Sequence, residues 1–161
     1  MNIRKNCEIL EISHEEIVDL LSTALYGSSY LSAEYDKDFY NSIPKDKTEG
    51  DCYEDHMADV LLNGGEIYFY DNDSDGEIYN NRSNAEVIDE GNGTEYTQYT
   101  ITLIDLIDGL QRAANGTYKT NNDSKWIAEC FSDFEQGEGD MDLIEADALM
   151  QIILFDELIY G

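Results

Sequence analysis

The spacing of hydrophobic residues along the chain predicts helices toward both ends and strands in the middle. Apolar positions recur every three to four residues in five segments, whereas β-branched and aromatic residues dominate the central part. We expect helices to begin at Ser13, at about residue 50, after Thr102, near Ser124 and after the acidic turn at 137–142. We expect strands at 66–70, 77–80 and 95–101, with a short fourth strand at 86–89.

Polar residues at the ends of these segments support several boundaries. Ser13 and Glu16 have the spacing of a capping box, and Gly27 is a natural end for the helix that follows. Segment 28–48 contains several aromatic residues without a clean period, so we expect a short helix followed by a loop. Residues 71–76, Asp-Asn-Asp-Ser-Asp-Gly, have the composition of a hairpin loop between the first two strands.

About five helices and three to four strands predict an α+β fold, in which the helices pack on a small antiparallel sheet. The chain has 161 residues, which is the size of one ordinary domain. With no internal repeat and no long linker, residues 1–161 are expected to form a single acidic domain.

The charge of the chain is unusual for a folded domain. It has 36 acidic and 9 basic residues and a formal net charge of -27. This charge repels phosphate backbones and anionic lipid, so we expect no direct binding to nucleic acid or membranes, and cationic partners instead. Three scattered cysteines and the lack of 18 consecutive apolar residues favour a soluble protein of a reducing cytoplasm.

The acidic residues are concentrated in two parts of the sequence. Residues 49–90 hold 13 acidic and 1 basic side chain, and residues 131–161 hold 9 acidic and no basic ones. The other two parts, 1–48 and 91–130, are close to ordinary, whereas a salt-adapted surface would spread its acids over all exposed segments. Solubility alone needs a net charge of only about 2–8 on a small domain.

The magnitude of the charge suggests imitation of DNA. A compact chain of this length is about 40 Å across, and duplex DNA of that length carries about 23 charges. Carboxylates could therefore act as phosphate surrogates on the cationic surface of a DNA-binding protein. The candidate residues come from the predicted second helix, the 71–76 loop and the acidic turn: Asp51, Glu54, Asp55, Asp59, Asp71, Asp73, Asp75, Asp133, Glu135, Glu138, Asp140 and Asp142.

Other chemistry has weaker support in the sequence. Residues 71–76 match the first half of an EF-hand loop, but the twelfth position is Arg82 instead of a carboxylate, which leaves a weak, partly hydrated cation site as an alternative to a hairpin tip. Cys52 and His56 are one helical turn apart, yet no second ligand pair accompanies them, and packing explains them better. Without nucleophile or phosphate-binding motifs, we expect no catalytic residues, no resident metal and no cofactor.

Two stretches give the chain a resemblance to a group of known proteins. Ala58-Asp-Val-Leu-Leu-Asn-Gly-Gly-Glu-Ile-Tyr-Phe-Tyr-Asp71 and the tail from Ala146 to Gly161 resemble small acidic proteins of bacterial phages and mobile elements. That group includes anti-restriction and anti-CRISPR inhibitors, several of which imitate DNA. The resemblance implies a phage protein that acts in the cytoplasm of a bacterial host, and it carries over no individual site residue.

The leading hypothesis is therefore a non-enzymatic inhibitor of a bacterial defence nuclease, either a CRISPR effector or a restriction enzyme. The alternative is a structural or regulatory phage protein that binds a protein partner through its tyrosine-rich surface, with the acids serving solubility or weak divalent-cation binding. Pairing of the strands across a homodimer is also compatible with the sequence. The sequence leaves the target open, and it leaves open whether the acidic segments share one face.

Overall fold

The computed structural model describes residues 7–119, 123–137 and 139–161. Six α-helices pack on one antiparallel four-stranded sheet in these parts of the chain, so the predicted α+β class is confirmed. The helices are α1 (His14–Tyr26), α2 (Lys37–Ser42), α3 (Tyr53–Leu62), α4 (Leu103–Asn115), α5 (Ser124–Gln136) and α6 (Leu143–Phe155). The strands are β1 (Leu31–Tyr35), β2 (Ile67–Asp71), β3 (Ala85–Asp89) and β4 (Glu95–Ile101), and two short 3-10 helices are η1 (Lys45–Lys47) and η2 (Tyr79–Asn81).

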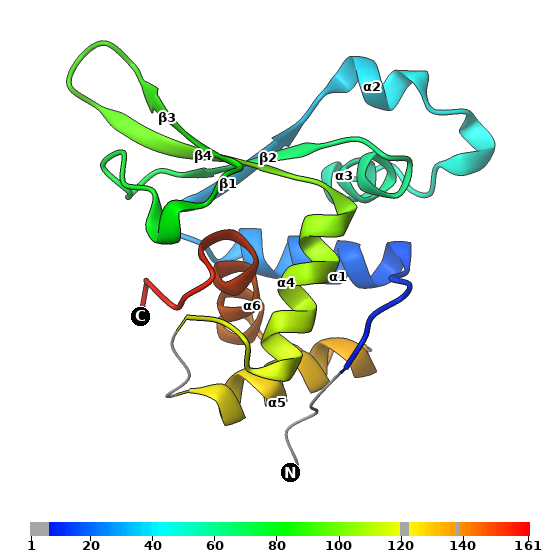
Figure 1. Cartoon of the computed structure of the whole chain (residues 1–161). Coiled ribbons are helices and arrows are strands. Elements are labelled where there is room, and N and C mark those ends of the chain that lie inside the picture. Colours follow the sequence, from blue (N-terminus) through cyan, green and yellow to red (C-terminus); the bar gives the residue numbers. More distant parts are fainter. Residues whose placement is uncertain (1–6, 120–122, 138) are drawn as a thin grey trace.

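The sheet has the strand order β1-β2-β4-β3 and forms the upper layer in Figure 1. Helices α1, α4, α5 and α6 lie below it, and α2 and α3 lie beside it. The inward face of the sheet contributes Ile67, Phe69, Tyr99 and Ile101 to the core, all with no exposed surface. The outward face carries partly exposed tyrosines instead.

Helix α6 is the centre of the helical layer. Nine of its thirteen residues are buried, so it is covered on all sides, although the sequence predicted only one inward stripe. It packs closely against α4 at Gly109, where an added Cβ would lie 2.7 Å from the Cα of Ile153. Two arginines neutralise its C-terminal end: Arg112 donates to the carbonyl of Ile152 and Arg82 to that of Ile153, both at 3.2 Å.

Two predictions about the strands are wrong. Residues 31–35, expected in a helix or loop, form β1, which pairs with β2 from Leu31 opposite Asp71 to Tyr35 opposite Ile67. Residues 77–80, expected as a strand, instead lead into η2, where Asn80 and Asn81 have φ values of 58° and 52°. The loop at 71–76 is therefore no hairpin tip. The β-hairpin of this region is formed by β3 and β4.

The remaining predicted elements are confirmed. Ser13 caps α1 in the predicted capping box with Glu16, and Thr102 caps α4, where it forms a capping box with Asp105. Gly116 ends α4 with a φ of 70°, a conformation that favours glycine.

Candidate partner-binding surface

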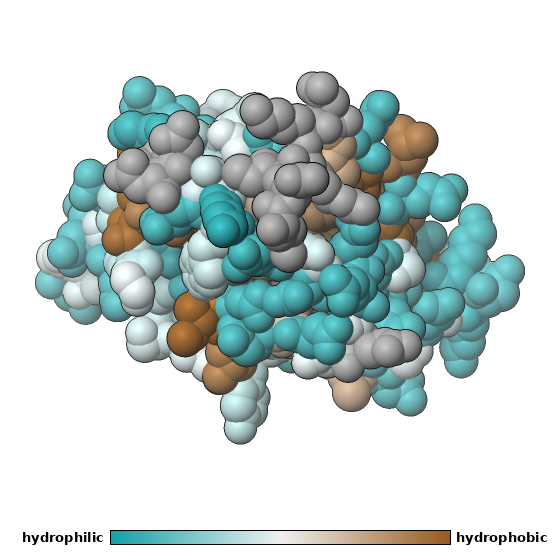
Figure 2. All heavy atoms as spheres, turned by 90° about the horizontal axis from the view of Figure 1, so that it is seen from below, coloured by the Kyte–Doolittle hydropathy of each residue, from teal (hydrophilic) through white to brown (hydrophobic). Residues whose placement is uncertain are grey.

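Most exposed charged side chains among the described residues are negative. Twenty-two Asp and Glu residues are exposed, against five lysines, Lys37, Lys45, Lys47, Lys119 and Lys125. The two described arginines are held against the C-terminal end of α6, so they add little positive charge to the outer surface. Seen from the side of α5, the surface is mostly hydrophilic, with separate hydrophobic patches (Figure 2).

The segment that contains α2 and η1 is the one balanced part of this surface. Three of the five exposed lysines lie there, together with three exposed aspartates, Asp36, Asp38 and Asp46. The rest of the described surface has nineteen exposed carboxylates and two exposed lysines. A cationic partner is therefore attracted to the molecule away from α2 and η1.

One group of exposed acids lies where the β3–β4 hairpin meets the loop after β2. We call this group the hairpin end and define it by the exposed residues Asp75, Glu77, Asp89, Glu90 and Glu95. Asp89 and Glu95 are directly opposite each other in the β3–β4 pair. Gly76, in the loop after β2, lies so close to β4 that an added Cβ would collide with the Glu95 carboxylate. Like charges in cross-strand positions are destabilising, so this arrangement has an energetic cost in the free protein.

The structure distributes the twelve predicted surrogate carboxylates unevenly. Six are exposed: Asp51, Asp73, Asp75, Glu135, Asp140 and Asp142. Three are partly exposed: Glu54, Asp55 and Asp133. Glu138 lies outside the described residues. The last two, Asp59 and Asp71, are buried and are withdrawn from the candidate surface, because a partner cannot reach their carboxylates.

Asp59 and Asp71 have internal roles instead. The Asp59 carboxylate accepts hydrogen bonds from the backbone N–H of Glu49, at 3.2 and 3.1 Å. The Asp71 carboxylate accepts a hydrogen bond from the Tyr160 hydroxyl, whose oxygen lies 2.9 and 2.8 Å from the two carboxylate oxygens. Burial raises the pKa of both aspartates, and these hydrogen bonds lower it in part.

A histidine from another helix lies among the acids of α3. His14 Nδ1 is 3.3 Å from Glu49, and its Nε2 is 3.3 Å from Asp59 and 3.8 Å from Asp55. The sequence showed no cation on the second predicted helix, and this neighbour comes from the first turn of α1. A protonated His14 would therefore offset part of the repulsion between these carboxylates.

Some acids near the start of α6 also have structural roles. Asp142 and Glu145 form the capping box of α6. Burial, followed by a hydrogen bond with Asp133, raises the pKa of Glu145 from an ordinary 4.5 to about 7. Glu145 is therefore partly protonated near neutral pH, so the start of α6 carries less negative charge than the sequence suggests.

The acidic segment 49–90 does not form one patch. Strand β2 begins near the C-terminal end of α3 and carries the chain about 16 Å to the loop at 71–76, by the usual rise of a strand. The acids of α3 and those of the loop are thus at opposite ends of β2 (Figure 1). At the hairpin end, the sequence analysis included Asp75 and missed four exposed acids, Glu77, Asp89, Glu90 and Glu95. Because residues 77–80 were expected to form a strand, the sequence analysis did not bring these acids together. The turn at Gly91-Asn-Gly93, which joins β3 to β4, was the sequence feature that could have placed Asp89 and Glu90 near Glu95.

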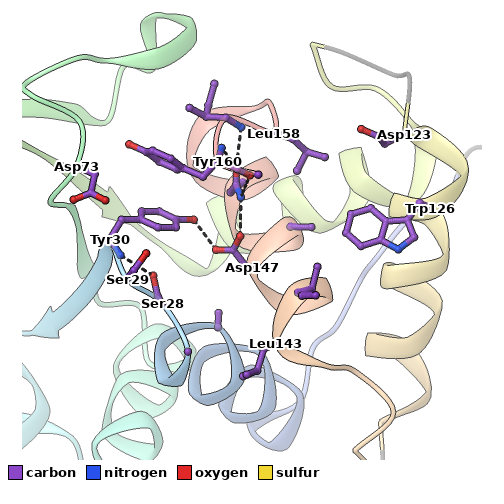
Figure 3. Close-up of a pocket in the computed structure, with 17 residues that line it drawn as sticks. Ser28, Ser29, Tyr30, Asp73, Asp123, Trp126, Leu143, Asp147, Leu158 and Tyr160 are labelled. Atoms are coloured by element: carbon purple, nitrogen blue, oxygen red, sulfur yellow. Dashed lines mark hydrogen bonds between the residues drawn. The ribbon is translucent and has the colours of Figure 1, made fainter.

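A groove brings acids from three separate parts of the chain together (Figure 3). It has a volume of about 770 Å³ and is lined by the end of α1, the beginnings of α5 and α6, and the C-terminal segment 158–161. Asp73, Asp123 and Asp147 are its carboxylates. The loop at 71–76 and the first half of α6 therefore meet here.

Packing explains one of the two residues that suggested a metal site. Cys52 is exposed at the N-cap of α3, so the expectation that packing explains it is wrong. The ring of His56 accepts or donates a 2.7 Å hydrogen bond at Nδ1 with the Tyr35 hydroxyl and stacks on Tyr40 at 3.9 Å. Within the described ranges, no group of three or more His, Cys, Asp or Glu side chains could hold a metal ion.

Comparisons with protein-family models, with curated proteins and with solved structures find no match to the chain. No helix in the described parts is long and apolar enough to cross a membrane. These comparisons therefore assign no function to the chain.

Proposed function

We propose that the protein is a non-enzymatic inhibitor of a bacterial defence nuclease, either a CRISPR effector or a restriction enzyme. It acts as an acidic mimic of DNA, and its carboxylates occupy the cationic surface on which the nuclease would hold phosphates. The phage or mobile-element origin implied by the sequence resemblance is part of this proposal.

The observation that carries the proposal is the excess of exposed carboxylates, twenty-two against five lysines among the described residues. Duplex DNA as long as the protein is wide carries about 23 negative charges, so the two surfaces have similar charge. The close acids of the hairpin end support it further, because their mutual repulsion is relieved when a cationic surface binds them.

The experiment measures inhibition of purified restriction enzymes and RNA-guided nucleases at increasing salt concentration. An inhibitor that binds through carboxylates should lose affinity steeply as salt rises. The double variant Asp89→Asn/Glu90→Gln removes two charges from the hairpin end and should weaken inhibition and flatten its salt dependence. The matched control, Asp38→Asn/Asp46→Asn, removes two exposed charges from the balanced segment and should leave inhibition nearly unchanged.

Inhibition that is insensitive to salt would reject DNA mimicry. Equal weakening by the two double variants would also reject the assignment of the hairpin end, because net charge alone would then explain the effect.

A second candidate function has support from the open face of the sheet. Tyr68, Tyr70 and Tyr96 are partly exposed there, with the rings of Tyr70 and Tyr96 5.6 Å apart. Tyrosine is enriched in protein interfaces, so this face could bind a structural or regulatory partner, or a second copy in a homodimer. Such binding would tolerate high salt and would weaken in Tyr96→Ser, which distinguishes it from mimicry.

A further inference from the structure

The acidic groove at the start of α6 has an apolar rim that the rest of the protein leaves uncovered. Trp126, Leu143 and Ile144 line it and are 38%, 44% and 69% exposed. Trp126 comes from α5, and the other two residues are the first two of α6. Apolar side chains gathered around a hollow are typical of a site where another molecule binds.

The floor of the groove is held in one arrangement by hydrogen bonds. The side chain of Gln151 donates to Asp147 at 2.7 Å and accepts the backbone N–H groups of Ile159 and Tyr160 at 2.7 and 2.9 Å. The rings of Tyr30 and Tyr160 pack together with centroids 4.3 Å apart. The groove is therefore formed before any ligand binds, which reduces the entropic cost of binding.

The carboxylate of Asp147 retains the capacity to bind a cation. One of its oxygens accepts the Tyr30 hydroxyl at 2.6 Å and the other accepts Gln151. Burial, followed by this hydrogen bond with Asp147, raises the pKa of Tyr30, so its hydroxyl remains a donor. Each carboxylate oxygen can accept a second hydrogen bond, and two such positions match the planar fork of a guanidinium group.

Two further carboxylates lie at the edge of the groove. Asp123 directly precedes α5, and its side chain makes no capping hydrogen bond with that helix. Trp126 follows three residues later in the chain, and both residues line the groove. Asp73 lines the other side (Figure 3). No lysine or arginine is among the described residues that line the groove.

We propose that this groove binds a segment of another protein in which an arginine is flanked by apolar residues. The arginine side chain hydrogen-bonds to the groove carboxylates and stacks on Trp126, and the flanking residues cover Leu143 and Ile144. The apolar rim and the acidic lining together define this occupant, because neither an anion nor a purely basic chain would match both features.

The described residues of a second copy of this chain do not supply such a segment. Its net charge of -27 would bring like charges together, and its two described arginines hold the end of α6. The test of this proposal is independent of DNA mimicry. The carboxylate that it removes, Asp123, is not one of the twelve predicted phosphate surrogates.

The test uses the fluorescence of Trp126, which is the only tryptophan of the chain. The full-length protein is titrated with a capped peptide that has one arginine between leucines and no aromatic residue. A second peptide has citrulline in place of arginine, which keeps the shape and removes the charge. We expect a saturable change in emission with the arginine peptide and affinity lower by about tenfold with the citrulline peptide, as for loss of a charge-assisted hydrogen bond.

Two groove variants and one control variant then separate the contributions of charge and apolar contact. Asp123→Asn should weaken binding of the arginine peptide severalfold, whereas Asp140→Asn, an equal charge change at an exposed position outside the groove, should leave it unchanged. Ile144→Ser should weaken both peptides. Melting curves of the variants confirm that they are folded.

Equal affinity for the two peptides, equal effects of the two aspartate variants, or no saturable change at millimolar peptide would each overturn the proposal. These results would leave DNA mimicry intact, because the nuclease assay depends on the hairpin end. Conversely, a nuclease assay without salt dependence would leave the groove proposal intact.

Discussion

The hydroxyl of Tyr160 fixes the C-terminal segment to the sheet, and it can be removed with little change in shape. It lies 2.9 and 2.8 Å from the two carboxylate oxygens of Asp71, which has no exposed surface. In Tyr160→Phe, the remaining donor described for this carboxylate is the backbone N–H of Asp73 at 3.1 Å. We therefore expect the substitution to destabilise the fold.

The size of the effect follows from the charge of the acceptor. A hydrogen bond to a charged group contributes about 1.5–3 kcal/mol, so the free energy of unfolding should fall by about 2 kcal/mol at pH 7. For a chain of this length, that change lowers the melting temperature by about 4–8 °C. The floor of the groove should loosen at the same time, since Tyr160 is part of it.

The loss should depend on pH. Burial raises the pKa of Asp71 in the folded protein, and the Tyr160 hydroxyl lowers it. Removing the hydroxyl raises this folded-state pKa further above the unfolded value. The folded state of the variant then binds a proton more readily. The loss in free energy of unfolding is therefore greatest at pH 7 and becomes smaller as the pH falls toward 4.

Chemical denaturation at pH 7 and pH 4, followed by circular dichroism, measures both quantities. Tyr118→Phe is the matched control, because the Tyr118 hydroxyl is buried without a hydrogen-bond partner among the described residues. Burial raises the pKa of Tyr118 to about 12, so its hydroxyl is neutral at both pH values. We expect this control to be neutral or stabilising. An equal loss for the two Phe variants, or a loss for Tyr160→Phe that is the same at both pH values, would refute the reasoning.

Three further substitutions test other parts of the structure. Gly109→Ala should lower the free energy of unfolding by about 1–3 kcal/mol in denaturation, because the collision with Ile153 outweighs the better helix propensity of alanine. Because the pKa of Glu145 is raised in the folded state, the fold loses stability as the pH rises from 4.5 to about 7. Glu145→Gln should therefore raise the free energy of unfolding by about 1–2 kcal/mol at pH 8, after allowance for solvent screening, and change it little at pH 4. Glu95→Gln removes the cross-strand repulsion with Asp89 and should stabilise the fold by about 0.2–1 kcal/mol at low salt, a gain that disappears at high salt.

The helices were predictable because their signals are local. Ser13 with Glu16 and Thr102 with Asp105 lie within one turn of each other, and the apolar periods that follow them are regular. Strand β1 lacks such a signal, since Leu-Ser-Ala-Glu-Tyr contains no β-branched residue. Its conformation depends on pairing with β2, more than thirty residues away.

The opposite error occurred at 77–80, where Ile78 and Tyr79 have strand propensity. Tyr79 packs its ring against Phe155 of α6 at 5.4 Å, and the backbone turns at Asn80. This contact joins two elements that are distant in sequence, so local propensity could not anticipate it.

The sequence predicted the negative charge of the candidate surface, but only some of the residues that form it. The spacing of Asp51, Asp55 and Asp59 predicts one exposed helix face, whereas α3 begins at Tyr53, after Asp51. His14 and the chain around Glu49 cover it at Asp59, and these contacts depend on how α1 meets α3. The groove was not predictable, because its acids come from three segments that only the fold brings together.

Displacement of DNA tests the central claim most directly. The full-length protein is immobilised, purified restriction enzymes and RNA-guided nucleases are passed over it at low salt, and bound enzyme is eluted with short duplex DNA at constant ionic strength. DNA mimicry predicts that at least one nuclease binds and that duplex DNA releases it, with weaker retention on Asp89→Asn/Glu90→Gln. Retention that duplex DNA leaves unchanged, or no binding to any nuclease of the panel, would contradict the claim.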